Sequence, residues 1–438
     1  MIKENFASCV FKNDRVIFKS YVNEFTNDLY EEFELNAKKI GLHSKIDDLF
    51  NGEKVNFTEG KAAWHTKYRA EYNPKRSDTS SQKKQQSELL NFYELCSNAK
   101  NIITIGIGGS FEGPKMLLEN IDRHIDTNFI FITGSDLSEF TIKTKKLRPE
   151  DSIFIISSKS FTTQETITLL KEAILWSGDI NKFVAITANK EEAKKYKIKR
   201  IFEFDNEIGG RYSIWSEISI LINWLNKENF DEFMAGGKQA DIDLNNNETY
   251  LKFVKTLAYS DIWLHNFRNK YSRAVLSYVW SLRSFPNYVQ QLEMESLGKQ
   301  PNINSEYKKT GQIIFGGYGP TAQHSYFQLL HQGTQDVCVD IIANKKDKKN
   351  LAYAQAIAQS ELLSRGTNDL KDQERINGNT PTNLFLMNNL DLYDLGYLLA
   401  TWEHRTYITA SILEINPFDQ FGVNAGKIYT NKYLYDKD

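Results

Sequence analysis

Short apolar runs alternate with longer amphipathic stretches in the first half of the chain. The apolar runs predict strands, and the amphipathic stretches between them predict helices. The predicted strands are residues 102–107, 129–133, 153–157, 183–187 and 201–204. Because these strands are almost continuously apolar and are joined by helices, they indicate a parallel sheet that is covered on both faces.

A second region further along the chain repeats this pattern. Strands are predicted at residues 274–278, 312–315 and 337–342, and helices at residues 321–332 and 353–364. Mostly helical stretches at residues 213–225 and 230–264 should link the two regions.

Helical patterns are also predicted at both ends of the chain. Residues 1 to about 73 are amphipathic with mixed charge, and residues 392–412 form a helical run rich in Leu and Tyr. The sequence therefore predicts an α/β protein with two related α/β layers and helical extensions.

Length and charge restrict the functions that the chain could have. Its 438 residues, 41% of them hydrophobic, can bury a large core and suggest two or three domains. A net charge of -2 gives no general attraction to nucleic acid or to an anionic membrane. Any anion must therefore be held by a local site.

Cysteine usage and the lack of targeting segments indicate the compartment. Cys9, Cys96 and Cys338 are odd in number and widely spaced, so they form neither a disulfide framework nor a zinc pattern. The first five residues lack the layout of a signal peptide, and no apolar run is long enough to cross a bilayer. We therefore expect a cytoplasmic protein.

Two strand-to-helix turns carry residues suited to binding a phosphate group. Residues 106–110 read Gly-Ile-Gly-Gly-Ser, and residues 157–163 read Ser-Ser-Lys-Ser-Phe-Thr-Thr. Free backbone N–H groups and the positive end of a helix dipole meet at such turns. The first turn alone would equally fit a tight connection with no ligand. Two turns in succession, one of them with a lysine, indicate a phosphorylated small molecule.

Two further segments carry charged residues whose role the sequence leaves open. Arg211 follows two glycines, where its guanidinium could contact a ligand oxygen or simply lie on the surface. Glu293 and Glu295 would share one face of a strand but would diverge on a helix. One of them could then enter a site while the other stays solvated, and two solvated glutamates are the alternative.

Two more segments carry histidines and a lone lysine. His324 and His331 are two turns apart on the predicted helix 321–332, so both imidazoles should lie near one face, with a structural or a catalytic role. Lys427 belongs to a polar cluster after the last apolar helix, where it could be a helix cap or a solvated side chain.

Taken together and in this order, these segments resemble the phosphoglucose isomerase family, also called the glucose-6-phosphate isomerase family. The matching segments are residues 105–114, 158–166, 209–213, 294–299, 323–334 and 418–427. Residues 56–59 with His65 and Arg69 are similar to an early helical motif of the family, although more loosely.

The resemblance implies a fold, an assembly and a reaction. The fold would be two sugar-isomerase α/β/α sandwich domains with parallel sheets and helical extensions at both ends. The expected divisions are an N-terminal extension at residues 1–80, domains at 81–225 and 226–400, and a C-terminal helical segment at 401–438. The family works as a homodimer with no metal or organic cofactor. It interconverts glucose 6-phosphate and fructose 6-phosphate through a cis-enediolate, in glycolysis and gluconeogenesis.

The resemblance also implies roles for single residues. Glu295 matches the base that moves the proton, and Arg211 matches the arginine that stabilises the enediolate. His324 resembles the acid/base that opens the sugar ring, which in this family comes from the partner subunit, and Lys427 resembles its counterpart at the ring oxygen.

Substrate binding follows from the same resemblance. The residues that match the phosphate loop and the sugar contacts are Ser158, Lys159, Ser160, Thr163, Gln420, Gly109, Ser110, Gly210, Gln291 and Glu165. Three departures from the family pattern matter here. Ser160 replaces a usual threonine and keeps the hydroxyl, Asn424 replaces a usual glutamate near Lys427, and Phe421 replaces a usual tryptophan.

Two other functions fit the same motifs. One is a non-catalytic regulator that binds sugar phosphates, which could lose Glu295, His324 and Arg211, although all three are present. The other is an isomerase that also accepts mannose 6-phosphate, since epimeric sugars share the phosphate group.

Overall fold

The computed structural model of the protein describes residues 7–72, 80–121, 126–346, 348–367 and 370–435. The first five residues, on which the expectation about a signal peptide depends, lie outside these ranges. Among the helices of the described ranges, none has the length and apolar character needed to span a membrane.

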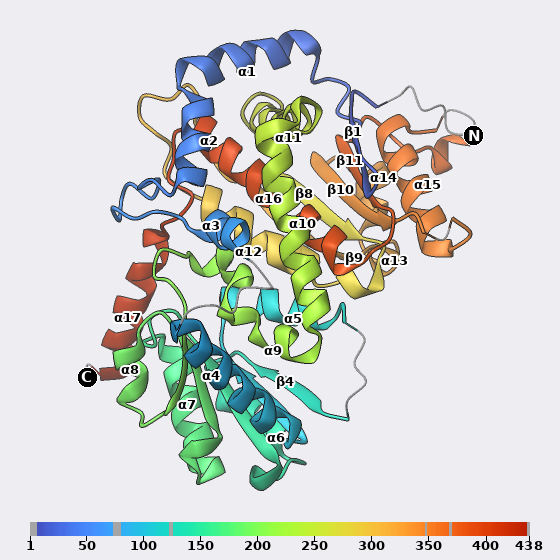
Figure 1. Ribbon diagram of the computed structural model, residues 1–438. Coiled ribbons are helices and arrows are strands. Elements are labelled where there is room, and N and C mark those ends of the chain that lie inside the picture. The colour runs from blue at the N-terminus through green and yellow to red at the C-terminus, as the bar shows by residue number, and fades with distance from the viewer. Residues whose placement is uncertain (1–6, 73–79, 122–125, 347, 368–369, 436–438) are drawn as a thin grey trace. The chain divides into compact units, whose positions relative to one another are not determined.

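The chain forms two compact units (Figure 1). Unit 1 consists of Met1–Ala63 and Ala235–Asp438, and unit 2 is the continuous segment Trp64–Met234 between them. Each unit contains one sheet.

The sheet of unit 2 has five parallel strands in the order β4-β3-β5-β6-β7. The strands are β3 (Asn101–Ile105), β4 (Asn128–Ile132), β5 (Ser152–Ser157), β6 (Phe183–Thr187) and β7 (Arg200–Glu203). Every residue of β3, β5 and β6 is buried, because these strands lie inside the sheet and helices cover both faces. The five strands predicted from the apolar runs are confirmed, with small shifts at their ends.

Helices of unit 2 pack on both faces of this sheet. The helices that lie wholly within unit 2 are α3 (His65–Glu71), α4 (Ser80–Ser97), α5 (Glu112–Leu118), α6 (Leu137–Thr144), α7 (Gln164–Ser177), α8 (Lys190–Lys194) and α9 (Ile220–Leu225). Ile102 of β3 belongs to one apolar cluster with Phe92 of α4, whereas the next residue, Ile103, belongs to another with Leu169 of α7. Successive side chains of a strand point to opposite faces, so each strand supplies both cores.

The sheet of unit 1 has six strands in the order β1-β2-β11-β10-β8-β9. The strands are β1 (Cys9–Lys12), β2 (Val16–Ser20), β8 (Ser272–Ser277), β9 (Ile313–Tyr318), β10 (Val337–Asn344) and β11 (Thr382–Met387). The last four strands along the chain are parallel to one another. In contrast, β1 and β2 form an antiparallel hairpin, and β2 pairs antiparallel with β11.

The hairpin shows that the expectation of an entirely helical N-terminal region is wrong. Residues Val16, Phe18 and Ser20 are buried in β2, and this strand pairs with β11, more than three hundred residues away along the chain. The local pattern at residues 9–20 does not specify this partner, and tertiary pairing outweighs local helix propensity. Helices begin only afterwards, with α1 (Asn27–Lys39) and α2 (Leu42–Asn51).

One long helix of unit 1, α16 (Leu392–Ile412), is buried, and its predicted bounds are confirmed. The helix α2 packs against it, as do α11 (Glu248–Phe267) and α12 (Phe285–Leu297). The other helices of unit 1 are α13 (Gly319–Ala322), α14 (Phe327–Gln332), α15 (Leu351–Arg365) and α17 (Asn424–Tyr435). The helix α10 (Lys227–Asn246) begins in the segment of unit 2 and continues into that of unit 1. Almost every residue of α16 is buried, including the charged Asp394, Glu403 and Arg405.

The helix predicted at residues 321–332 is interrupted. It consists of α13 and α14, with a turn between them that contains His324. This turn allows Ala322 and Phe327 to enter the same apolar core. The expectation that His324 and His331 share one face of a continuous helix is therefore wrong.

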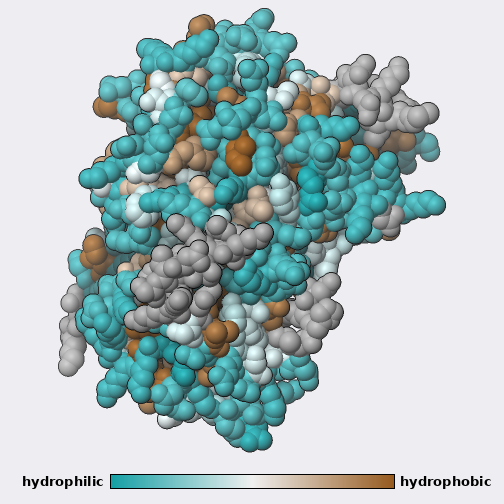
Figure 2. Space-filling view, viewed as in Figure 1, coloured by the Kyte–Doolittle hydropathy of each residue, from teal (hydrophilic) through white to brown (hydrophobic). Residues whose placement is uncertain are grey.

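Hydrophilic residues predominate on the face of the molecule in Figure 2, and the exposed apolar side chains in this view are scattered among them. Scattered apolar side chains are ordinary on a folded protein and do not mark a binding surface.

Candidate active site

The loop between β5 and α7 in unit 2 holds its hydroxyl groups by hydrogen bonds within the loop. Ser158 Oγ lies 3.1 Å from Thr163 Oγ1 and accepts a hydrogen bond from the Phe161 amide at 3.1 Å. Phe161 has a left-handed backbone (φ 53°), and its side chain is buried in the core below the loop. Thr163 precedes α7 but makes no side-chain capping bond to that helix. Its hydroxyl therefore belongs to the loop and not to the helix cap.

The backbone of the same loop is fixed to β6. The Lys159 carbonyl accepts hydrogen bonds from the Ala188 amide and from Thr187 Oγ1, both at 3.0 Å. Ser160 is exposed and accepts a hydrogen bond from the Thr162 amide at 3.2 Å. The first turn of α7 has N–H groups with no acceptor inside the helix, so loop and helix together offer donors suited to a phosphate.

The glycine-rich turn after β3 contacts the segment that carries Arg211. A Cβ atom at Gly109 would lie 1.8 Å from the Gly210 carbonyl oxygen, so only glycine fits there. A Cβ atom at Gly106 would lie 3.0 Å from the Ser157 carbonyl oxygen at the end of β5. The structure thus brings the ends of β3 and β5 and the segment around Gly210 together, at the edge where α/β sheets usually bind ligands.

Arg211 is 3% exposed and lies in a short 3₁₀ helix, Gly210–Trp215. Two residues of α3 support this segment. The His65 ring stacks on Tyr212 with centroids 4.5 Å apart, and the Arg69 guanidinium lies 4.5 Å from the centre of the Trp215 ring. In the early motif of residues 56–59 with His65 and Arg69, these last two residues therefore have a structural role, because they pack on the segment that carries Arg211.

Sequence reasoning missed Glu217, which follows this segment. Its Oε2 atom is buried and has no hydrogen-bond partner among the described residues. Burial raises the pKa of Glu217 to about 7, and the nearby charge of Asp205 adds to the increase. The available signal was a single carboxylate in the otherwise apolar or small-polar residues 212–222.

In unit 1, the paired glutamates lie on α12 and have different surroundings. Glu295 is half-buried, and Gln291, one turn earlier, donates a hydrogen bond from Nε2 to Glu295 Oε1 at 3.3 Å. Glu293 is 3% exposed and is bonded to Arg273 and Trp402. The alternative of two solvated glutamates is therefore wrong, since Glu293 belongs to the core.

Three segments of unit 1 that are far apart in sequence meet at Asp419. Lys299 Nζ lies 2.8 Å from Asp419 Oδ1, and Thr58 Oγ1 donates to Asp419 Oδ2 at 2.7 Å. These contacts join the segment after α12, the early motif and the C-terminal motif. Beside them is a cavity of about 550 Å³, lined by Phe57, Thr58, Gly298, Lys299, Gln300, Asn302, Glu414, Ile415, Asn416, Asp419, Phe421 and Gly422. Sequence reasoning gave no role to Lys299, Asp419 or Thr58.

The other site residues expected in unit 1 are exposed. Gln420 follows Asp419 directly, and Lys427 lies in the first turn of α17, which Asn424 begins. His324 is exposed in the turn between α13 and α14. His331 is half-buried and lies 2.8 Å from Gln359 Oε1, and burial lowers its pKa, which favours a structural role.

The expected site residues are divided between the two units. Unit 2 contains Gly109, Ser110, Ser158, Lys159, Ser160, Thr163, Glu165, Gly210 and Arg211. Unit 1 contains Gln291, Glu295, His324, Gln420 and Lys427. Glu165 lies in the first turn of α7, where a carboxylate interacts favourably with the helix dipole.

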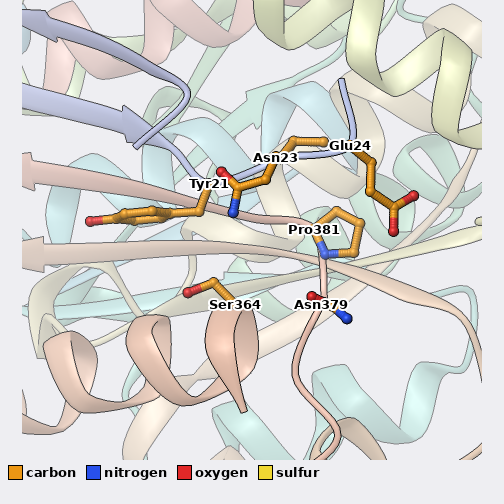
Figure 3. Close-up of a pocket in the computed structure, with 7 residues that line it drawn as sticks. Tyr21, Asn23, Glu24, Ser364, Asn379 and Pro381 are labelled. Atoms are coloured by element: carbon orange, nitrogen blue, oxygen red, sulfur yellow. The ribbon is translucent and has the colours of Figure 1, made fainter. Parts of the chain in front are cut away.

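A smaller cavity in unit 1 is unsuited to a sugar phosphate (Figure 3). Its volume of about 20 Å³ has room for roughly one water molecule. It is lined by Tyr21, Val22, Asn23, Glu24, Ser364, Asn379 and Pro381, none of which is an expected site residue.

Comparison with known proteins links these features to a family. A model of the phosphoglucose isomerase family matches residues 20–437. The chain is 33% identical over 423 residues to a glucose-6-phosphate isomerase of Albidiferax ferrireducens, which covers 90% of this chain and 81% of the relative. It is 34% identical over 454 residues to one of Shewanella halifaxensis, which covers 91% and 83%.

Solved structures share the fold. A glucose-6-phosphate isomerase from Chlamydia trachomatis has a TM-score of 0.84 at 24% identity, covering 97% of this chain and 89% of that chain. A hypothetical protein from Thermus thermophilus has a TM-score of 0.75 at 20% identity, covering 94% and 98%. These likenesses confirm the expected α/β fold with parallel sheets.

Proposed function

Because this chain belongs to the phosphoglucose isomerase family, we propose that it interconverts glucose 6-phosphate and fructose 6-phosphate, in glycolysis and gluconeogenesis. One observation carries this proposal: the match spans residues 20–437 and includes Glu295, Arg211 and the loop at residues 158–163. A regulator without catalysis would not need Glu295 or Arg211.

The substrate's phosphate group binds to the loop at residues 158–163 and the first turn of α7. Support comes from the hydroxyl groups of Ser158 and Thr163, which lie 3.1 Å apart, and from the amide groups of the helix N-terminus. Lys159 and Ser160 supply a positive charge and a further hydroxyl, and Gln420 also contacts the phosphate. The phosphate thus fixes one end of the sugar, whichever isomer is bound.

The reaction moves one proton between neighbouring carbons. Glu295 takes the proton from carbon 2 of the open-chain aldose and returns it to carbon 1, while the hydroxyl proton passes from the oxygen of carbon 2 to that of carbon 1. The guanidinium of Arg211 stabilises the negative charge of the enediolate between these steps. Gln291 holds the carboxylate of Glu295 by its hydrogen bond, and Gly109, Ser110, Gly210 and Glu165 line the sugar.

Ring opening precedes the proton transfer, and it involves His324 and Lys427. We propose that the protein is a homodimer and that His324 acts in the partner subunit's site. Support for this role is that His324 is exposed in its own chain. We also propose that the protein works in the cytoplasm, where sugar phosphates are metabolised. The free thiols of Cys9, Cys96 and Cys338 are compatible with a reducing compartment.

A coupled assay tests the proposed reaction. The purified protein is given fructose 6-phosphate, and the glucose 6-phosphate formed is followed by its dehydrogenase as NADPH. We expect continuous NADPH production, because all of the proposed catalytic residues are present. No production, with retained binding of fructose 6-phosphate, would favour the non-catalytic regulator. Formation of fructose 6-phosphate from mannose 6-phosphate in a parallel assay would show the bifunctional isomerase.

Mixing two inactive variants tests the shared site of the proposed dimer. We expect His324→Ala and Glu295→Gln, each with little activity alone, to regain roughly a quarter of the wild-type rate after being unfolded and refolded together in equal amounts. The reason is that half of the dimers are then mixed, and each mixed dimer has one site with both native residues. If the mixture stays as inactive as its components, His324 does not act across the interface.

A further inference from the structure

Five ionisable side chains from five different elements form one buried cluster in unit 1. They are Asp261 of α11, Arg273 of β8, Glu293 of α12, Asp340 of β10 and Arg405 of α16, each at most 8% exposed. Arg405 donates from Nε and Nη2 to Asp261 at 2.6 and 2.8 Å and from Nη1 to Asp340 at 2.7 Å. Arg273 Nη1 lies 2.7 Å from Asp261, and its Nη2 donates to Glu293. The hydrogen bond from Arg273 to Glu293 therefore links α12 to β8 and to the rest of the buried cluster.

The cluster has one carboxylate more than it has guanidinium groups. Burial raises the pKa of Glu293, although Arg273 and Arg405 act in the opposite direction. Burial also acts to raise the pKa of Asp261, but the two arginines outweigh it and the pKa is lowered. Glu293 Oε2 accepts the hydrogen bond from Arg273. Its other oxygen accepts a hydrogen bond from Trp402 Nε1 of α16 at 2.6 Å, so both oxygens have fixed donors.

Glu293 and the proposed base point to opposite sides of α12. Two residues along an α-helix are separated by roughly 200° around its axis. Glu293 accordingly faces the core, while Glu295 is half-buried and accepts a hydrogen bond from Gln291. A helix turns as a rigid element over so short a distance. The rotation of α12 about its axis that lets Glu293 accept both hydrogen bonds therefore also determines the direction in which the Glu295 side chain points.

We propose that Glu293 is a positioning residue, which fixes the rotation of α12 through Arg273 and Trp402 and thereby places the carboxylate of Glu295. This inference rests on the proposed function, in which Glu295 moves the proton. Glu293 itself does not contact the substrate.

Other contacts of α12 act together with this restraint. Leu292 and Val289 are buried, and their apolar packing is less directional than a hydrogen bond. Gln290 Nε2 donates to the Ile314 carbonyl of β9 at 2.6 Å, which holds the helix to the sheet at a second point. Hydrogen bonds at both points set the angle of the helix, since their strength depends on direction. A displacement of a reacting group by about 1 Å can reduce a rate by about 100-fold.

Two variants weaken this link and test the proposal. Glu293→Gln keeps the size of the side chain but has only one acceptor oxygen for two donors. Trp402→Phe removes the indole N–H and shortens the ring that packs on Phe285 of α12. We expect kcat with fructose 6-phosphate to fall about 10-fold for Glu293→Gln and less for Trp402→Phe, with KM changed by less than about threefold. The double variant should match Glu293→Gln, because both changes break the same link.

Asp241→Asn is the matched control. It changes a buried carboxylate of α10 that lies 2.8 Å from His404 Nε2 of α16. We expect it to lower the melting temperature but to leave kcat unchanged. Hydrogen exchange along α12 should become faster in Glu293→Gln and Trp402→Phe and stay unchanged in Asp241→Asn.

Two results would overturn the proposal. One is an unchanged kcat in both α12-directed variants, and the other is unchanged exchange along α12. If Glu293→Gln does not fold, Trp402→Phe decides the question by the same measurements. The wild-type rate decides the proposed function separately, because exchange along α12 is measured without substrate.

Discussion

Replacing Glu295 by glutamine is expected to abolish isomerisation and to leave binding of fructose 6-phosphate nearly unchanged. An amide of the same size cannot accept the proton from carbon 2, whereas the phosphate contacts of residues 158–163 do not involve it. General base catalysis contributes about 10²–10⁴-fold to a rate, and the loss should be at least this large, because one group both takes and returns the proton. The hydrogen bond from Gln291 can be kept by the new carbonyl oxygen.

Turnover is measured by the coupled assay, and binding by calorimetry with fructose 6-phosphate. Glu361→Gln on α15 is the control, since the side chain of this glutamate is 39% exposed and its ion pair among the described residues is with Arg365. It should retain the full rate. An equal loss of turnover and binding in Glu295→Gln would show that Glu295 supports the fold and does not carry the chemistry.

Replacing Glu217 by glutamine should stabilise the protein above neutral pH. The pKa of Glu217 is raised to about 7 by burial, compared with 4.5 for an ordinary glutamate. The folded state therefore binds a proton between these two values that the unfolded state has released. The contribution of Glu217 to the free energy of unfolding is therefore greatest below its pKa in the unfolded state. It falls as the pH rises between the two pKa values and stays low above the pKa in the folded state. The expected loss is about 3 kcal/mol, and glutamine, which never ionises, should escape it.

Urea unfolding of the two proteins at about pH 5 and about pH 8 measures this difference. The wild type should lose stability between the two pH values relative to Glu217→Gln, and the two should be nearly equally stable at the lower pH. Glu361→Gln again serves as the control, with the same pH dependence as the wild type. Parallel pH profiles for wild type and Glu217→Gln would show that Glu217 is ionised and solvated in the folded protein.

Local pattern was enough to predict the parallel strands of unit 2. The strands β3, β5 and β6 are short, apolar and buried on both faces, so their position is visible in the sequence alone. The strands of unit 1 that sequence reasoning missed depend instead on pairing between segments that are distant along the chain. In β2, Ser20 pairs with Asn383 of β11, and no local signal connects segments so far apart. The buried strand β11 was also missed, although all of its residues are buried.

The candidate site also has one part that the sequence predicts and another part that it does not. Motif residues such as Ser158 and Glu295 could be named from the sequence, because their order along the chain resembles a known family. The contacts that hold them could not, because their partners are distant in sequence. Glu293 meets Trp402 across 109 residues, and Lys299 meets Asp419 across 120. Residue type predicts which groups can react, and only tertiary packing reveals which groups hold them in place.

The close approach of Gly109 to Gly210 constrains the evolution of this chain unevenly. A methyl group on Gly109 would collide with the neighbouring carbonyl, whereas one on Gly210 would meet no atom within 4 Å. A larger residue is therefore sterically excluded at Gly109. At Gly210 there is room for a Cβ atom, so sterics alone would allow a substitution there. If selection also preserves Gly210, the reason is to be sought in the bound sugar and not in the folded chain.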